Sequence, residues 1–336
     1  MARDLTHTET LLIALGGNAL IRKGQVGTVE EQFINLRPPV RQIARLSRRY
    51  RIIITHGNGP QVGNLLLQQE HCSDVPPVPL EILVAQTQGQ IGYMIESTLD
   101  SELMNLGVQT EQPIVSLISY VVVNERDPAF QDFSKPIGPV FTAEKAALLP
   151  YPTRKTREGY RRVVASPRPV SIVEKREIRK LLEMGFIVIC CGGGGIPVIR
   201  DGRAFSGVDA VIDKDLASAV LAEEVGVDLF LIATDVEAVA LHYGKPEQRS
   251  LKKLTAGQAK EYMKDGHFPP GSMGPKVEAV LQFLDRCKGR AVITSIEAIE
   301  AAVEGRAGTE FTIEDFRTQS TGYSRTTEGG PIPPAE

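Results

Sequence analysis

The chain has 336 residues, with 38 lysines and arginines against 41 aspartates and glutamates, so its formal net charge is −3. This balance argues against a general nucleic-acid-binding protein, which usually carries a clear basic excess, and 42% hydrophobic with 24% charged residues are typical of a soluble globular protein. No run of about 18 apolar residues indicates a membrane helix, and the polar start does not resemble a secretory signal. The four cysteines show no CxxC spacing, so we expect a cytoplasmic chain with reduced thiols.

Short apolar runs that end in tight turns alternate with helical patterns along most of the chain. The first two runs, at 11–15 and 51–55, predict buried strands, and the helical stripe between them over 30–49 is broken by Pro38-Pro39. This repetition of strand, turn and helix predicts an α/β fold with a mostly parallel sheet. The other predicted helices are 61–70, 81–106, 174–184, 215–225, 255–264, 276–288 and 295–304, and the other predicted strands are 114–123, 186–191, 228–233 and 291–294.

Two segments depart from this alternation. Residues 124–169 are rich in proline, with basic residues between the prolines. They predict an excursion from the main sheet, either a small subdomain or a long loop. From about residue 317 to 336 the chain is rich in Ser, Thr, Gly and Pro without periodicity, which predicts a disordered tail.

Small and polar residues follow four of the predicted strands. In open α/β sheets, ligands bind at the carboxyl ends of the strands, and glycine-rich turns offer backbone N–H groups that suit phosphate. One such turn is weak support, because glycines also make ordinary tight turns, but several at neighbouring strand ends predict one ligand crevice. The four turns are Gly16-Gly17-Asn18, Gly57-Asn58-Gly59, residues 192–195, and Thr234-Asp235.

The known phosphate-binding motifs are missing from these turns. The chain has no GxxxxGK[ST] and no GxGxxG that opens the first helix, which disfavours an ordinary P-loop enzyme and an ordinary Rossmann dehydrogenase. The five histidines lack HExxH or Cys/His spacing, so no zinc site is predicted. His56, before the second glycine turn, is interpreted as a hydrogen-bonded structural histidine in preference to a reactive one.

Three lysines lie where a phosphoryl group would need positive charge. Lys214 stands between Asp213 and Asp215 at the start of a predicted helix, and Lys276 follows a glycine-rich approach to another helix. Lys135 lies within the excursion. Taken singly, each is also compatible with a solvated surface charge.

Eight segments together resemble a known family. They run in order over about residues 11–309 and are ALGGNAL (14–20), THGNGPQVG (55–63), QGQIGYM (88–94), KPIGP (135–139), CGGGGIPV (191–198), GVDAVIDKDLAS (207–218), ATDVEAV (233–239) and GSMGPKVEA (271–279). The series resembles the carbamate kinases of the amino acid kinase fold. THGNGPQVG, KPIGP and VIDKD separate it from the acetylglutamate, aspartate and uridylate kinases of that fold.

The resemblance implies a fold, an activity and an assembly. The fold would be a three-layer sandwich with a mostly parallel sheet and a small protruding subdomain, and the activity would be reversible phosphoryl transfer between carbamoyl phosphate and ADP, giving ATP and carbamate, with Mg²⁺. The family is a homodimer. The kinase domain would span 1–310, with a carbamoyl phosphate lobe over about 10–217 that contains a lid at about 124–169, and a nucleotide lobe over about 218–310.

The resemblance also implies roles for individual residues. Gly16, Gly17 and Asn18 would hold the transferring phosphate, and Gly57, Asn58 and Gly59 would line the carbamoyl end. Lys214 and Lys276 would neutralise the transition state, with Asp215 orienting Lys214 and Lys135 closing over the substrate from the lid. The nucleotide would be surrounded by Thr234, Asp235, Val236, Tyr243 and Met273.

Two departures from the family pattern are visible. Gly274 stands where the family usually has alanine, and the chain continues for about two dozen residues beyond Ala307-Gly308-Thr309, near which family members commonly end. Two other hypotheses stay open from the sequence: a kinase of the same fold that acts on another small carboxylate or carbamoyl compound, and a nucleotide-binding regulator without catalysis. The retained lysines argue against the regulator.

Overall fold

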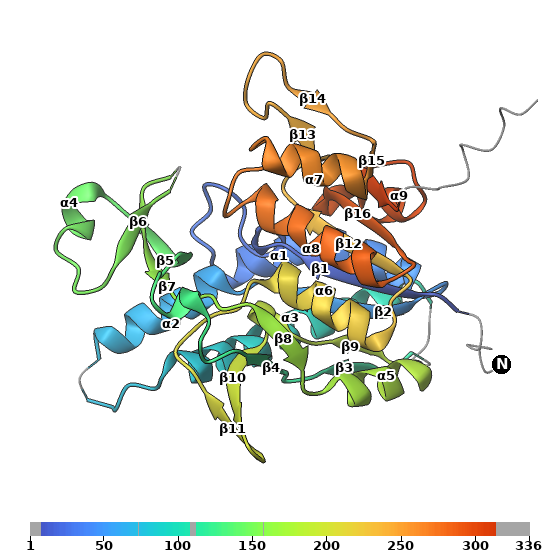
Figure 1. Cartoon of the computed structure of the whole chain (residues 1–336). Helices are drawn as coiled ribbons and strands as arrows, with labels where there is room; N and C mark the ends of the chain where they lie inside the picture. Colours follow the sequence, from blue (N-terminus) through green and yellow to red (C-terminus); the bar gives the residue numbers. More distant parts are fainter. Residues whose placement is uncertain (1–7, 73, 108–111, 157, 314–336) are drawn as a thin grey trace, which may run out of the picture.

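The computed structural model describes residues 8–72, 74–107, 112–156 and 158–313, and its centre is an eight-stranded sheet (Figure 1). The strands from β16 to β3 pair in parallel, whereas β17 runs antiparallel to β16. The mostly parallel sheet is therefore confirmed. In spatial order its strands are β15 (Lys253–Thr255), β17 (Thr309–Thr312), β16 (Arg290–Ser295), β12 (Leu229–Thr234), β1 (Thr10–Leu15), β2 (Arg51–His56), β9 (Ile187–Ile189) and β3 (Ile114–Ser116).

Strand β1 shows why helices cover both faces of the sheet. All six of its residues are buried, and Leu11 and Ile13 belong to one core cluster while Leu12 and Ala14 belong to the other. Alternate side chains of a strand point to opposite faces, so a strand buried on both faces is a continuous apolar run. One cluster contains residues of α1 (Val29–Leu46), α3 (Leu80–Asn105) and α9 (Ile299–Val303), and the other contains residues of α5 (Lys175–Glu183), α6 (Lys214–Val225), α7 (Ala256–Lys264) and α8 (Met273–Arg286). The three-layer sandwich is confirmed.

Three smaller sheets surround this sandwich. One of them protrudes at the left of Figure 1 with the short helix α4 (Ala143–Ala146), and it falls within the predicted excursion at 124–169, which we call the lid. The helix α2 (Gly59–Glu70) lies beside it. The lid sheet is β5 (Lys135–Phe141), β7 (Tyr160–Val164) and β6 (Thr153–Lys155); the others are β11 (Ala204–Gly207), β10 (Ile196–Asp201), β4 (Tyr120–Val123) and β8 (Pro169–Ile172), and the pair β13 (Ala240–Leu241) and β14 (Arg249–Ser250). The short 3-10 helices are η1 (Gly17–Ala19), η2 (Pro128–Phe130), η3 (Gly192–Gly194) and η4 (Ile296–Ala298).

The predicted break at Pro38-Pro39 is wrong. Helix α1 continues through both prolines and begins with a capping box between Thr28 and Glu31. A proline inside a helix costs about 3 kcal/mol or more, whereas each fully buried aliphatic side chain contributes about 1.5–3 kcal/mol. The buried stripe that α1 packs towards α3, which includes Leu36 and Val40, outweighs the prolines.

The single strand predicted over 114–123 is also wrong, because β3 and β4 belong to different sheets. Between them, the side-chain amide of Gln88 bonds the backbone of Ser119, accepting from its N–H at 2.9 Å and donating to its carbonyl at 3.3 Å. Gln88 thus takes the place of a strand neighbour for the N–H of Ser119, while the carbonyl of Ser119 also accepts from Ile196 in β10 at 2.9 Å, so the chain can leave the central sheet at this point. The helix predicted over 295–304 is likewise divided, into η4 and α9.

Three further predictions concern the C-terminal tail, membrane helices and the cysteines. The predicted tail at 317–336 lies outside the described residues. Within the described part of the chain, no helix is both long and apolar enough to cross a bilayer. The four cysteines are free, and Cys190 and Cys191 are buried.

Gly63 generates a stability prediction. A Cβ at this position of α2 would lie 2.0 Å from the Cα of Gly138 in β5, so no side chain fits where the lid meets the helix. Glycine to alanine inside a helix normally stabilises by about 0.5–1 kcal/mol; we expect Gly63→Ala instead to destabilise by about 1–3 kcal/mol, because the lid backbone must shift. The free energy of unfolding from urea titration measures this.

The matched control is Gly89→Ala in α3, where a Cβ would meet nothing within 4 Å. It should be neutral or stabilising. Equal effects of the two substitutions would contradict the proposed contact.

Candidate active site

The carboxyl ends of the central strands lie side by side. Gly16, after β1, donates its N–H to the carbonyl of Ala233 in β12 at 2.8 Å, and Gly57, after β2, donates to Leu15 at 3.1 Å. A Cβ at Gly16 would lie 2.9 Å from the Ala233 carbonyl oxygen. The first glycine turn can therefore approach β12 this closely only because residue 16 has no side chain. The predicted strand-end turns therefore meet at one edge of the sheet.

Two adjoining cavities open at this edge. Gly17, Lys214, Ser272 and Lys276 line both of them. The first has a volume of about 220 Å³ and is lined by every residue predicted to surround the nucleotide, as well as by Gly16 and Asn18. The second has a volume of about 200 Å³ and is lined by the turn at 57–59 and by Lys135. The structure thus brings all of the sequence-predicted site residues to one crevice.

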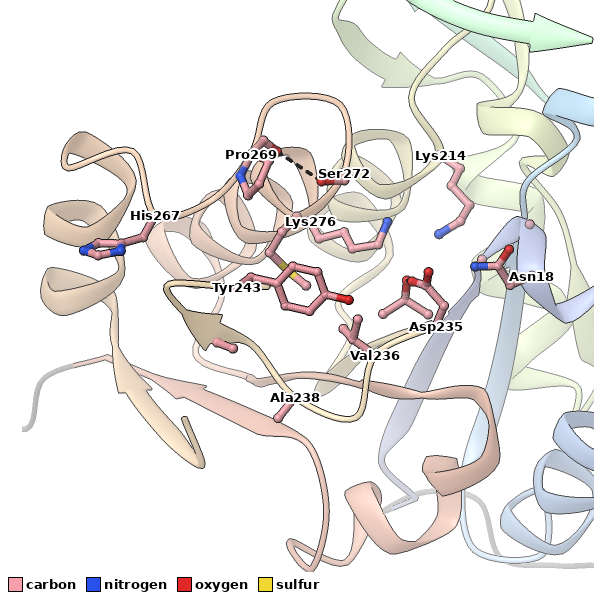
Figure 2. Close-up of a pocket in the computed structure, with 15 residues that line it drawn as sticks. Asn18, Lys214, Asp235, Val236, Ala238, Tyr243, His267, Pro269, Ser272 and Lys276 are labelled. Atoms are coloured by element: carbon pink, nitrogen blue, oxygen red, sulfur yellow. Dashed lines mark hydrogen bonds between the residues drawn. The ribbon is translucent and has the colours of Figure 1, made fainter. Parts of the chain in front are cut away.

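Figure 2 shows how the side chains of the first cavity are arranged. The ammonium groups of Lys214 and Lys276 lie at the same end as Asn18 and Asp235, while Tyr243 lies further along beside Val236. His267 lines the far end, where its ring stacks edge-on against His242 with centroids 4.8 Å apart. Sequence analysis did not identify Ala238, Ala240, His267, Pro269 and Ser272, which also line this cavity.

Asp215 is the electrostatic centre of the crevice. Its carboxylate is 4% exposed; Lys214 donates to Oδ1, and Lys276 donates to Oδ2 at 3.0 Å. Burial alone would raise the pKa of Asp215, but the two ammonium groups hold it well below its usual range. Asp215 is therefore a fixed anion, with both oxygens occupied by lysines.

The two lysines respond differently to this shared carboxylate. Burial lowers the pKa of Lys214, helped by the neighbouring charge of Lys276, and Asp215 only partly offsets this. For Lys276, burial also lowers the pKa, but Asp215 outweighs it and the net pKa lies above the usual value. The side chain of Lys214 is only 10% exposed, so the alternative of a solvated surface lysine is wrong.

Asp213 connects the lid to the start of α6. One carboxylate oxygen accepts the backbone N–H groups of Asp215 and Leu216, at 2.9 and 3.3 Å, and caps the helix. The other accepts from Nζ of Lys135 in the lid strand β5 at 2.5 Å. Burial would raise the pKa of Asp213, yet Lys135 lowers it below its usual value. The lysine of the lid thus points into the crevice.

His56 supports the second glycine turn from behind. Its ring is buried against Gly192, and Nδ1 lies 3.2 Å from the carbonyl oxygen of Gly57. Burial lowers its pKa to about 4, so the ring is neutral at physiological pH and Nδ1–H can donate to Gly57. This geometry favours the structural interpretation of His56.

Close backbone approaches complete the crevice walls. Gly193 has φ +67°, and a Cβ there would lie 2.2 Å from the amide nitrogen of Asn58. Asn58 in turn donates to Thr87 at 2.8 Å. At Gly274, an alanine Cβ would lie 3.1 Å from the carbonyl oxygen of Pro269, so the family's usual alanine requires only a small shift there. Among the described residues, no cluster of three or more His, Cys, Asp or Glu could hold a metal ion.

Comparison with known proteins gives a consistent identification. The sequence profile of the amino acid kinase family matches residues 9–295. A carbamate kinase of Thermococcus kodakarensis is 48% identical over 310 residues, covering 89% of this chain and 98% of the relative, and one of Haemophilus influenzae is 47% identical over 307 residues, covering 90% and 96%.

Solved structures agree with these sequence matches. The carbamate kinase of Giardia lamblia bound to citric acid superposes with a TM-score of 0.86 at 35% identity, covering 92% of this chain and 99% of that one, and its complex with AMP-PNP gives a TM-score of 0.83 at 36% identity, with the same coverage. The chain therefore belongs to the amino acid kinase family and, within it, to the carbamate kinases, which transfer a phosphoryl group between carbamoyl phosphate and ADP.

Proposed function

We propose that the crevice carries out this transfer with Lys214, Lys276 and Asp215 as its electrostatic centre. The observation that supports it is a buried carboxylate shared by two ammonium groups, which stand where the two cavities adjoin. A phosphoryl group moving from one cavity to the other would pass these cations. Phosphoryl transfer depends mainly on positioning and charge stabilisation, and this arrangement provides both.

The two cavities divide the substrates between them. We assign the nucleotide to the larger cavity, because Tyr243 and Met273 offer apolar surface for a base while Asp235 lies towards the lysines. Thr234 and Val236 also line this cavity. We assign carbamoyl phosphate to the smaller cavity, where Gly57, Asn58 and Gly59 face the lid. Gly17, which lines both cavities, and Asn18 would present backbone N–H groups to the transferring phosphate, while Gly16, whose N–H is donated to Ala233, would shape the turn that holds them. The carbamoyl phosphate lobe at about 10–217 and the nucleotide lobe at about 218–310 remain part of this proposal.

The reaction needs no general base. A carbamate oxygen is already anionic and attacks the γ-phosphorus of ATP, the bond to the bridging oxygen breaks, and ADP leaves with the electron pair. The two lysines stabilise the charge that develops on the phosphoryl oxygens. Asp215 cannot accept a proton at neutral pH, since its pKa lies well below the usual range, and its role is to hold both ammonium groups in place.

Magnesium would enter with the nucleotide. Mg²⁺ is usually held by one or two carboxylates and the substrate phosphates. Asp235 lines the nucleotide cavity, and its Oδ1 accepts from Thr234 at 3.0 Å, which fits one oxygen ligand near the phosphates. When bound, the ion would neutralise phosphate charge; the protein's own contribution is the orientation of that carboxylate.

We propose that the lid supplies a further cation, Lys135, and shields the reaction. Lys135 reaches Asp213 from β5, so the lid already touches the crevice. We propose that closure brings Lys135 onto carbamoyl phosphate and excludes water, because acyl phosphates and carbamate both react with it.

The activity and the lysine roles are tested together. ATP formation from ADP and carbamoyl phosphate with Mg²⁺, followed in a coupled assay, should be robust for the intact protein. Lys214→Ala and Lys276→Ala should each lower kcat by at least about a hundredfold, the scale of losing one transition-state donor. Lys260→Ala, which removes an exposed lysine paired with Asp285, is the control. Near-normal turnover in either site variant would refute its role.

The role of Asp215 has a pH signature. Asn at this position keeps the shape but removes the charge that raises the pKa of Lys276 and partly restores that of Lys214. Both lysines should then lose their protons at lower pH, so the alkaline limb of the kcat profile should move to lower pH by at least about one unit. Asp285→Asn should leave the profile unchanged, and an unshifted limb in Asp215→Asn would sink the assignment.

We also propose a homodimer formed along the β3 edge of the central sheet. Strand β3 ends the sheet, and nearby Ile118 and Tyr120 are 51% and 38% exposed. Light scattering should give the mass of two chains, and Ile118→Glu should shift it towards one chain. Leu148→Glu, in the exposed part of the lid, is the control. A monomeric wild type rules the dimer out.

A further inference from the structure

Arg161 is a cation of the crevice that the sequence patterns did not single out. It lies on strand β7 of the lid and lines the smaller cavity together with Lys135, Lys214 and Lys276. Its guanidinium donates two hydrogen bonds to the carbonyl oxygen of Gly138, from Nε at 3.0 Å and from Nη2 at 2.7 Å. Gly138 is also the residue that touches α2 at Gly63. Arg161 therefore holds the lid strand at its contact with the body of the protein.

Arg161 has no salt-bridge partner in the part of the chain that the structure describes. Across the described residues no acidic side chain forms a salt bridge with it, whereas each lysine of the crevice has one and the adjacent Arg162 pairs with Glu70. Arg161 is partly buried, and this burial lowers the pKa of its guanidinium below the usual value, with only a weaker opposing effect from Glu158. A desolvated charge without a counter-ion is unfavourable. An anionic ligand would remove that penalty.

The net charge of the side chains that line the cavity indicates what anionic charge a ligand can carry there. Among the described residues that line it, the four cations are Lys135, Lys214, Lys276 and Arg161, and the two carboxylates are those of Asp213 and Asp215. The net charge is thus +2 with Arg161 and +1 without it. A monosubstituted phosphate group near neutral pH carries a mean charge of about −1.5 to −2, so the charge of a fully ionised acyl phosphate is matched by these residues only when Arg161 is included.

The guanidinium also has donors to spare. It carries five N–H groups, and the two hydrogen bonds to Gly138 use one from Nε and one from Nη2. A planar guanidinium can bind one acceptor through one edge and an oxyanion through another, which a lysine ammonium cannot do with the same geometry.

We propose that Arg161 binds the anionic end of carbamoyl phosphate from the lid while it keeps its bonds to Gly138, so that substrate binding fixes the position of the lid. This inference rests on the proposed assignment of the smaller cavity to carbamoyl phosphate. It makes Arg161 a substrate-binding residue with a second, positioning function, and it predicts that loss of its charge affects carbamoyl phosphate and not ADP.

Two substitutions separate anion binding from a purely structural clasp. Arg161→Gln removes the charge but keeps N–H groups that can donate to Gly138. Arg161→Lys keeps the charge but loses the planar guanidinium, which can donate to two acceptors at once. We expect Arg161→Gln to raise the KM for carbamoyl phosphate by about 10-fold to 100-fold, the scale of one charge-assisted hydrogen bond, with the KM for ADP within twofold. Arg161→Lys should raise the KM for carbamoyl phosphate less, by about threefold to tenfold.

The control is Arg154→Gln, which lies opposite Arg161 on the neighbouring strand and pairs with the exposed Asp132. It should leave both KM values unchanged. A KM for carbamoyl phosphate within twofold of wild type in Arg161→Gln overturns the inference, as does an equal rise in both KM values, which would indicate a distorted lid. If thermal melting shows that Arg161→Gln does not fold, Arg161→Lys decides, and an unchanged KM in that variant overturns it. An inactive wild type would contradict the proposed function instead.

Discussion

The crevice depends on one buried interaction, the carboxylate of Asp215 held between Lys214 and Lys276. Two ammonium groups forced together would repel each other and lose protons on burial. The single carboxylate between them raises the pKa of Lys276 above its usual value and limits the lowering of the pKa of Lys214. The three charges leave a net +1 at the place where a phosphoryl group would transfer, and the carboxylate among them is occupied by both lysines and does not act as a base.

Helix α6 brings these charges together through its first turn. Asp213 caps the helix, Lys214 begins it and Asp215 follows, so three consecutive residues reach the lid, the crevice and α8. The cap orients these three side chains, because the start of a helix fixes the backbone of its first residues. The cationic pocket also explains why a net charge of −3 for the whole chain is uninformative: the charges that matter are few and local.

The parts of the fold and site that could be predicted from sequence are those set by local pattern. Apolar runs such as 11–15 indicate strands buried on both faces, and the turns after them must meet at one sheet edge because parallel strands share their direction. The continuation of α1 through Pro38 could not be predicted, since it depends on packing towards α3. The separation of β3 from β4 depends on Gln88, which is distant in sequence. Arg161 looks like any basic lid residue until Gly138 and the cavity are placed beside it.

The lid and the core of the site are linked through Asp213 and Gly138. Lys135 pairs with Asp213, and Arg161 bonds Gly138, which rests directly on α2. An anion that draws Lys135 from Asp213 does not leave that carboxylate uncompensated, because it still accepts two N–H groups at the start of α6 and faces the positive end of the helix. In the proposed closure, exchange of the lid lysine between carboxylate and substrate would therefore need no rearrangement of the core, and the movement would be resisted mainly by the close contact between β5 and α2 at Gly138 and Gly63.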